Sequence, residues 1–67
     1  MSLSDYRRSL ELSYDNTPFG ALIMAAIRKA DSVNLTLLQV AFPEIWHELD
    51  ERYNAPGGVI ASDHRNG

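Results

Sequence analysis

The chain has 67 residues, a net charge of −3 and no cysteine. This length allows one domain at most, and the acidic balance disfavours nucleic acid and anionic membranes as partners. Without cysteine, neither a disulfide nor a thiolate metal site can add stability. Self-association is then the natural way for so short a chain to bury more apolar surface.

The first expected helix runs from Ser4 to about Tyr14. Ser4 is a suitable N-cap, because its hydroxyl can accept a hydrogen bond from an unpaired N–H group of the first turn. Leu3, Tyr6, Leu10 and Tyr14 recur at spacings of three and four residues. This spacing predicts one apolar stripe along the helix.

The second expected helix begins at Thr17-Pro18 and extends to about Ala30. Thr17 can cap it, and Pro18 suits the first helical position because no N–H partner is lost there. The helix is apolar nearly all round, which predicts burial on more than one side. In a chain this short, such burial requires a central position in the fold, a partner subunit, or both. The interface candidates are the small or adaptable residues on its second face, Gly20, Ala21, Met24 and Ala25.

The third expected helix starts after an N-cap at Asn34 and carries no charged residue as far as Ala41. Pro43 cannot donate a backbone hydrogen bond, and the residue before a proline is pushed out of helical geometry. We therefore expect a break at Phe42 and a fourth helix from Pro43 to Tyr53.

The predicted fold is all-α, a small bundle of three to four short helices. Residues 1–56 form the expected domain and residues 57–67 an expected flexible tail, because Pro56-Gly57 is a turn signal and the remainder has no periodicity. No stretch alternates between apolar and polar residues as a strand would. The expected core consists of Tyr6, Leu10, Phe19, Leu22, Ile23, Ala26, Ile27, Leu35, Leu38, Phe42, Trp46, Leu49 and Tyr53.

Glu44-x-x-His47 is the sharpest chemical motif in the sequence. In helical di-iron and di-manganese proteins a Glu-x-x-His pair supplies two metal ligands, and in a dimer Glu11 is available as a further carboxylate. At ~100° per residue, however, Glu44 and His47 project opposite to the apolar stripe of the fourth helix, whereas bundle ligands project inward. We therefore assign no metal or cofactor site and treat the metal site as the weaker alternative.

The same angular placement puts Glu44, Glu48 and Glu51 together on the outer side of the fourth helix. This acidic face is a candidate binding surface for a basic partner, as in a regulator or nucleic-acid mimic. The alternative is an ordinary solvated surface.

Catalysis and DNA binding find little support in the sequence. There is no cysteine nucleophile, and no serine lies in the strand–turn–helix context of a nucleophile elbow. A recognition helix needs basic or amide side chains, but the third helix is uncharged and the fourth is acidic. No apolar run approaches the ~20 residues that span a bilayer.

The leading hypothesis is a non-enzymatic protein-interaction module in the cytoplasm of a bacterium. We expect it to be a homodimer and to be able to bind a further, unidentified protein.

Overall fold

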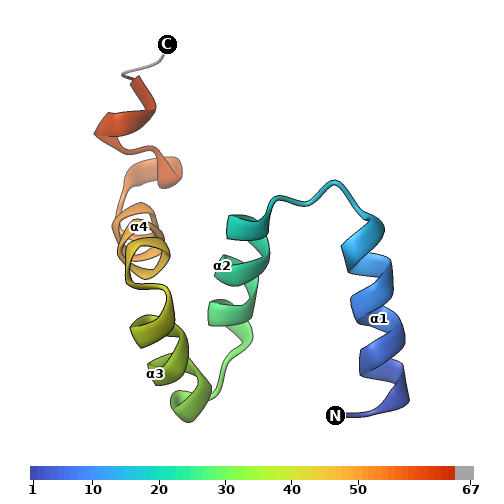
Figure 1. Cartoon of the computed structure of the whole chain (residues 1–67). Coiled ribbons are helices and arrows are strands. Elements are labelled where there is room, and N and C mark those ends of the chain that lie inside the picture. The colour runs from blue at the N-terminus through green and yellow to red at the C-terminus, as the bar shows by residue number, and fades with distance from the viewer. Residues whose placement is uncertain (65–67) are drawn as a thin grey trace.

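The computed structural model describes residues 1–64, and in this part of the chain all regular secondary structure is helical, with no strand (Figure 1). Its elements are α1 (Leu3–Tyr14), α2 (Phe19–Lys29), α3 (Ser32–Ala41) and α4 (Pro43–Tyr53), followed by two short 3₁₀ turns, η1 (Pro56–Gly58) and η2 (Ala61–His64). The predicted fold class, a small all-α fold of three to four short helices, is confirmed, and the described chain has four α-helices.

α1 begins earlier than the sequence suggested, because its N-cap is Ser2 and not Ser4. The Ser2 hydroxyl accepts a hydrogen bond from the Asp5 amide at 3.1 Å, and the Asp5 carboxylate accepts one from the Ser2 amide at 3.0 Å. This reciprocal pair is a capping box, which satisfies two otherwise unpaired donors at once. Ser4 has no carboxylate or amide side chain three residues later and so offers a poorer cap.

α2 lacks a side-chain cap, and the predicted cap at Thr17 is wrong. The N-cap is Pro18, whose carbonyl accepts the first helical hydrogen bond from Leu22 at 3.2 Å. The Thr17 hydroxyl donates instead to the Asp15 carboxylate, at 3.1 Å.

α3 is capped by Asp31, so the predicted cap at Asn34 is also wrong. The Asp31 side chain accepts a hydrogen bond from the Asn34 amide at 2.8 Å, and the Asp31 carbonyl accepts from the Leu35 amide at 2.8 Å. Asn34 therefore occupies the third helical position, where its backbone is the donor that the cap satisfies.

The corner at Phe42-Pro43 is confirmed. Phe42 has φ −131° and ψ 63°, outside helical values, while Pro43 opens α4. The Phe42 amide still donates to Leu38 at 2.8 Å and its carbonyl accepts from Trp46 at 3.0 Å, so the corner loses little hydrogen bonding. The rings of Phe19 and Phe42 lie in an edge-to-face arrangement with their centroids 5.9 Å apart, a favourable aromatic geometry that ties the start of α2 to the corner.

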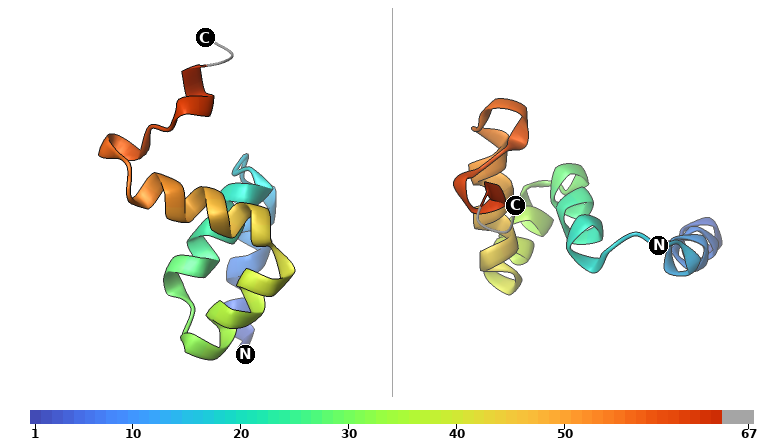
Figure 2. Two further views of the ribbon diagram at one scale, coloured as in Figure 1. Left: turned by 90° about the vertical axis from the view of Figure 1, so that its left-hand side faces the viewer. Right: turned by 90° about the horizontal axis from the view of Figure 1, so that it is seen from above.

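The packed part of the molecule consists of α2, α3 and α4, with α4 lying across the other two (Figure 2). Ile27 of α2 and Leu49 of α4 are buried at the centre of this unit. Of the other predicted core residues, Tyr6, Leu10, Phe19 and Tyr53 are exposed, contrary to expectation. The remainder are half-buried: Leu22, Ile23, Ala26, Leu35, Leu38, Phe42 and Trp46.

The segment after α4 continues beyond the end of that helix (Figure 1). η1 packs against α4, and Ile60 is only 8% exposed, which makes it one of the three most buried apolar residues among positions 1–64. Gly57 and Gly58 have φ of 63° and 72°, a left-handed conformation that glycine adopts without steric cost. Of the predicted tail 57–67, residues 57–64 thus have a definite conformation, and residues 65–67 lie outside the described part of the chain.

Candidate interaction surfaces

The first candidate surface is the apolar stripe of α1, formed by Leu3, Tyr6, Leu10 and Tyr14. All four side chains are exposed, from 38% for Leu10 to 82% for Tyr14. α1 stands apart from the rest of the molecule and, over residues 1–64, contacts no other helix (Figure 1). The predicted stripe is therefore present, but nothing in the described chain covers it.

Four polar side chains of α1 interact within the helix itself. Arg8 and Glu11 form an ion pair one turn apart, away from the stripe. The hydroxyls of Ser9 and Ser13 donate to backbone carbonyls of the preceding turn, at 2.6 and 2.7 Å. These four side chains do not need a partner from another element, whereas the apolar side chains of the stripe remain exposed to water.

The linker between α1 and α2 holds the two helices apart. Asp15 (φ −78°, ψ 157°) and Pro18 (φ −62°, ψ 148°) have extended, polyproline-like backbones, and Thr17 is restricted because it precedes a proline. The Asp15 carboxylate accepts hydrogen bonds from the Asn16 amide at 2.7 Å and from the Thr17 hydroxyl at 3.1 Å. At the polyproline rise a four-residue linker reaches at most about 12 Å, so this linker acts as a short spacer.

The second candidate surface is the outer face of α3, which the sequence analysis did not single out. Val33, Leu37 and Val40 follow one another at spacings of four and three residues, and all are exposed, Val40 by 78%. The helix contains no charged residue. A row of large apolar side chains on an uncharged helix normally lies against a partner.

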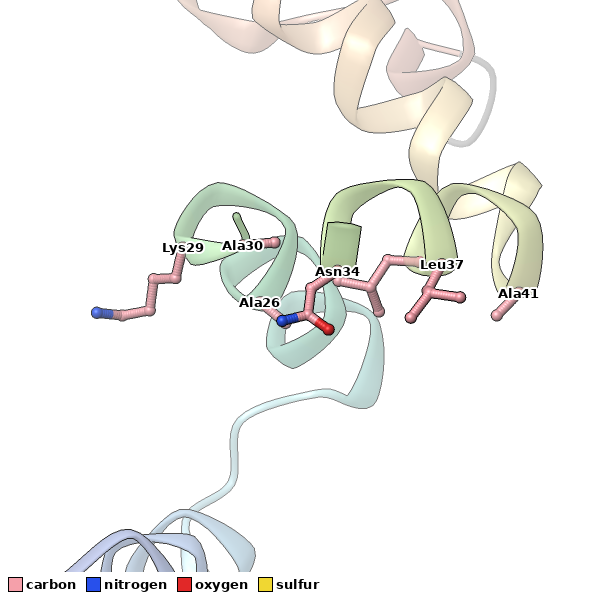
Figure 3. A pocket seen from close by; sticks show the side chains of 7 residues that line it. Ala26, Lys29, Ala30, Asn34, Leu37 and Ala41 are labelled. Carbon is pink, nitrogen blue, oxygen red and sulfur yellow. The ribbon is translucent and has the colours of Figure 1, made fainter. Parts of the chain in front are cut away.

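Two hollows flank this row. One, with a volume of about 480 Å³, lies between α2 and α3 (Figure 3) and is lined by Ala26, Lys29, Ala30, Asn34, Leu37, Leu38 and Ala41. The other, of about 440 Å³, is lined by Ser32, Val33, Thr36 and Leu37. Leu37 borders both, and the small alanine side chains leave room for bulkier groups to enter the first hollow.

The small-residue patch predicted on α2 is divided in the structure. Ala21 and Ala25 are exposed, whereas Gly20 and Met24 are half-buried at the edge of the packed unit. A Cβ atom added to Gly20 would meet nothing within 4 Å, so packing inside one chain does not require a glycine there. Whether these four residues form an interface stays a prediction.

The acidic residues of α4 lie where the helical wheel placed them. Glu44, Glu48 and Glu51 are exposed, and so is His47. Glu48 accepts a hydrogen bond from Arg52 at 3.4 Å, which neutralises part of this face. The role of the face in binding a basic partner stays a prediction.

In residues 1–64, the fold does not bring the residues of the alternative metal site together. α1, which carries Glu11, makes no contact with α4 in the described part of the chain. Across residues 1–64, no three His, Cys, Asp or Glu side chains are grouped closely enough to hold a metal ion.

Arg52 and Asp63 form a contact that sequence reasoning missed, since they are eleven positions apart and follow no motif. Nη1 and Nη2 of Arg52 donate to the two carboxylate oxygens of Asp63 at 2.8 and 2.7 Å, and Nη1 also donates to the Gly58 carbonyl at 2.8 Å. The Ile60 amide donates to Asp63 at 3.0 Å. The guanidinium hydrogen bonds, and then the Ile60 amide, hold the pKa of Asp63 well below its usual range.

Comparison with known proteins adds no analogue: no protein-family model matches the sequence, and no curated protein or solved structure shows significant similarity to it. Among the described helices, none has both the length and the apolar content needed to cross a membrane. Function is therefore inferred from the surfaces described above.

Proposed function

We propose that this chain is a non-enzymatic helical interaction module that works as a homodimer, and that the dimer contact covers the apolar stripe of α1. The observation that carries the proposal is the isolation of α1, whose large apolar side chains lie in water with no partner in residues 1–64. Exposing such a stripe costs free energy that association recovers.

The dimensions of the chain support the same proposal. Its radius of gyration is 14.1 Å, whereas a compact domain of this length is expected to have about 11 Å. Its accessible surface is 5665 Å², against about 4,250 Å² expected for a compact monomer of this mass, an excess of about 1,400 Å². A stable protein–protein interface typically buries about 800 Å² per partner, so the excess is large enough for one.

Sedimentation equilibrium at micromolar concentration tests the proposal directly. We expect the wild-type chain to sediment as a dimer and the variant Leu10→Asp to dissociate, with a dissociation constant at least about tenfold higher. The substitution removes an apolar side chain from the middle of the stripe and places a charge there. The matched control is Ser9→Asp, which adds the same charge to the same helix away from the stripe and leaves the dimer intact.

A wild-type chain that stays monomeric throughout this range would contradict the proposal. So would equal weakening of the dimer by Leu10→Asp and Ser9→Asp, because the contact would then depend on charge and not on the stripe. We also propose that the module works in a bacterial cytoplasm. A chain without cysteine is compatible with that reducing compartment.

A further inference from the structure

We propose a docking site for the stripe, and this inference rests on the proposed self-association. The helix α1 of one copy binds the outer face of α3 and the adjoining α2–α3 hollow of a second copy. The α1 helix of the second copy binds the same surface of the first. Each chain thus gives one helix and receives one. The occupant of the α3 surface is a second copy of this chain.

The first reason is that one chain has two uncovered apolar helix faces that do not meet. In Figures 1 and 2, α2 lies between α1 and α3. The extended linker at residues 15–18 keeps α1 away from its own packed unit, and α1 and α3 make no contact within the described residues. Two copies can pair these faces without rearranging either fold.

The second reason is chemical match. The stripe offers two leucines and two tyrosines, and the α3 surface offers Val33, Leu37 and Val40 with a hollow on each side of Leu37. Buried tyrosines usually need a hydrogen-bond partner for the hydroxyl, and the polar side chain of Asn34 lies along the hollow beside Leu37 (Figure 3).

Charge on the remaining surfaces favours α3 as the docking site. The exposed side of α2 ends in Arg28 and Lys29, and the outer side of α4 carries three glutamates. α3 itself has no charged residue, and Lys29, which borders the α2–α3 hollow, extends away from Asn34 and Leu37 (Figure 3). An apolar stripe can therefore dock on α3 while the Lys29 ammonium stays in water.

Size and symmetry are also compatible. α1 has 12 residues and α3 has 10, which correspond to about 18 and 15 Å of helix. An exchange in which the same two surfaces meet twice around a two-fold axis is closed, so association stops at the dimer.

The absence of cysteine gives a clean background for testing the contact by disulfide trapping. Leu10→Cys and Leu37→Cys chains, one of them labelled with ¹⁵N, are mixed as reduced dimers and then mildly oxidised. Both positions lie near the middle of their helices, so they come together whether α1 runs parallel or antiparallel to α3. Mass spectrometry distinguishes the mixed disulfide from the two symmetric ones by isotope content.

We expect the mixed disulfide to be nearly the sole cross-linked product, whereas random collision would make it half of all cross-linked product. The matched control pairs Ser9→Cys with Leu37→Cys and gives no excess of the mixed species. A predominance of either symmetric product, in which two Leu10→Cys chains or two Leu37→Cys chains are joined, overturns this inference if the chain sediments as a dimer, and leaves the proposed function standing. A strictly monomeric chain overturns both.

Discussion

At the scale of single residues, Arg52 is the side chain that joins the C-terminal turns to the packed unit. Its planar guanidinium binds both oxygens of Asp63 and also the Gly58 carbonyl, a fork that lysine cannot reproduce. Ile60 lies three positions before Asp63 and is buried, so it supplies the apolar part of the same attachment. The attachment therefore combines one directional polar contact with one apolar anchor.

The depressed pKa of Asp63 leads to a prediction about pH. Because the folded-state pKa lies below the unfolded value of about 3.9, the contribution of this contact is complete above that value and disappears as pH falls through the lower, folded-state pKa. We expect NMR titration of the Asp63 carboxyl group to give a pKa well below about 3.9 in the wild-type chain. Protection of the Ile60 amide from hydrogen exchange should persist to correspondingly low pH.

Two Arg52 variants control this experiment. Arg52→Gln should return the pKa of Asp63 most of the way to an ordinary aspartate value, because the main cause of the depression is the guanidinium hydrogen bond. Arg52→Lys keeps the positive charge but loses the fork and should give an intermediate pKa. An ordinary Asp63 pKa in the wild-type chain would show that the contact does not persist in solution.

At the scale of elements, sequence reasoning predicted the helices well and their first residues poorly. The break at Phe42-Pro43 could be predicted because proline geometry is a local constraint. The N-caps could not, since Asp31 and Asn34 are both good caps a few positions apart and only the completed turn selects one. The burial of Ile60 was not predicted, because the sequence around it has no apolar periodicity.

The candidate surfaces show the same limit at the level of packing. The spacing of Tyr6 and Leu10 predicted an apolar stripe, which is present, but periodicity does not say which element covers a stripe. Leu37 and Val40 belong to a helix whose apolar residues cover more than half of its circumference at ~100° per residue, so the sequence did not indicate which of them face outward. The outward side is fixed by how α2 and α4 pack against α3.

The cap of α3 supplies a prediction at this scale. We expect Asp31→Ala to lower the free energy of unfolding by about 1 kcal/mol, because the Asn34 amide loses its acceptor. Asp31→Asn keeps a side-chain oxygen at the same place and should change the stability by only a few tenths of a kcal/mol. Urea unfolding followed by circular dichroism measures both, and an Asp31→Ala chain as stable as Asp31→Asn would refute the assignment of this cap.

At the scale of the whole molecule, the chain measures 42 × 28 × 19 Å, and α1 stands beside the packed unit (Figure 1). Isolated helices shorter than about 12–15 residues are marginal in water, and α1 has 12 residues. Its capping box helps to start the helix but cannot replace an apolar contact along its length. The stability of α1 should therefore depend on association.

This dependence gives the last prediction. When the protein is diluted from well above to well below its dimer dissociation constant, we expect the helical signal in far-UV circular dichroism to fall by about a quarter, since α1 supplies 12 of the 44 α-helical residues in the described chain. Leu10→Asp should show the lower signal at every concentration, and Ser9→Asp should follow the wild-type curve. Helicity that stays constant while sedimentation records dissociation would mean that α1 is stable by itself, and the stripe would then serve binding without being ordered by it.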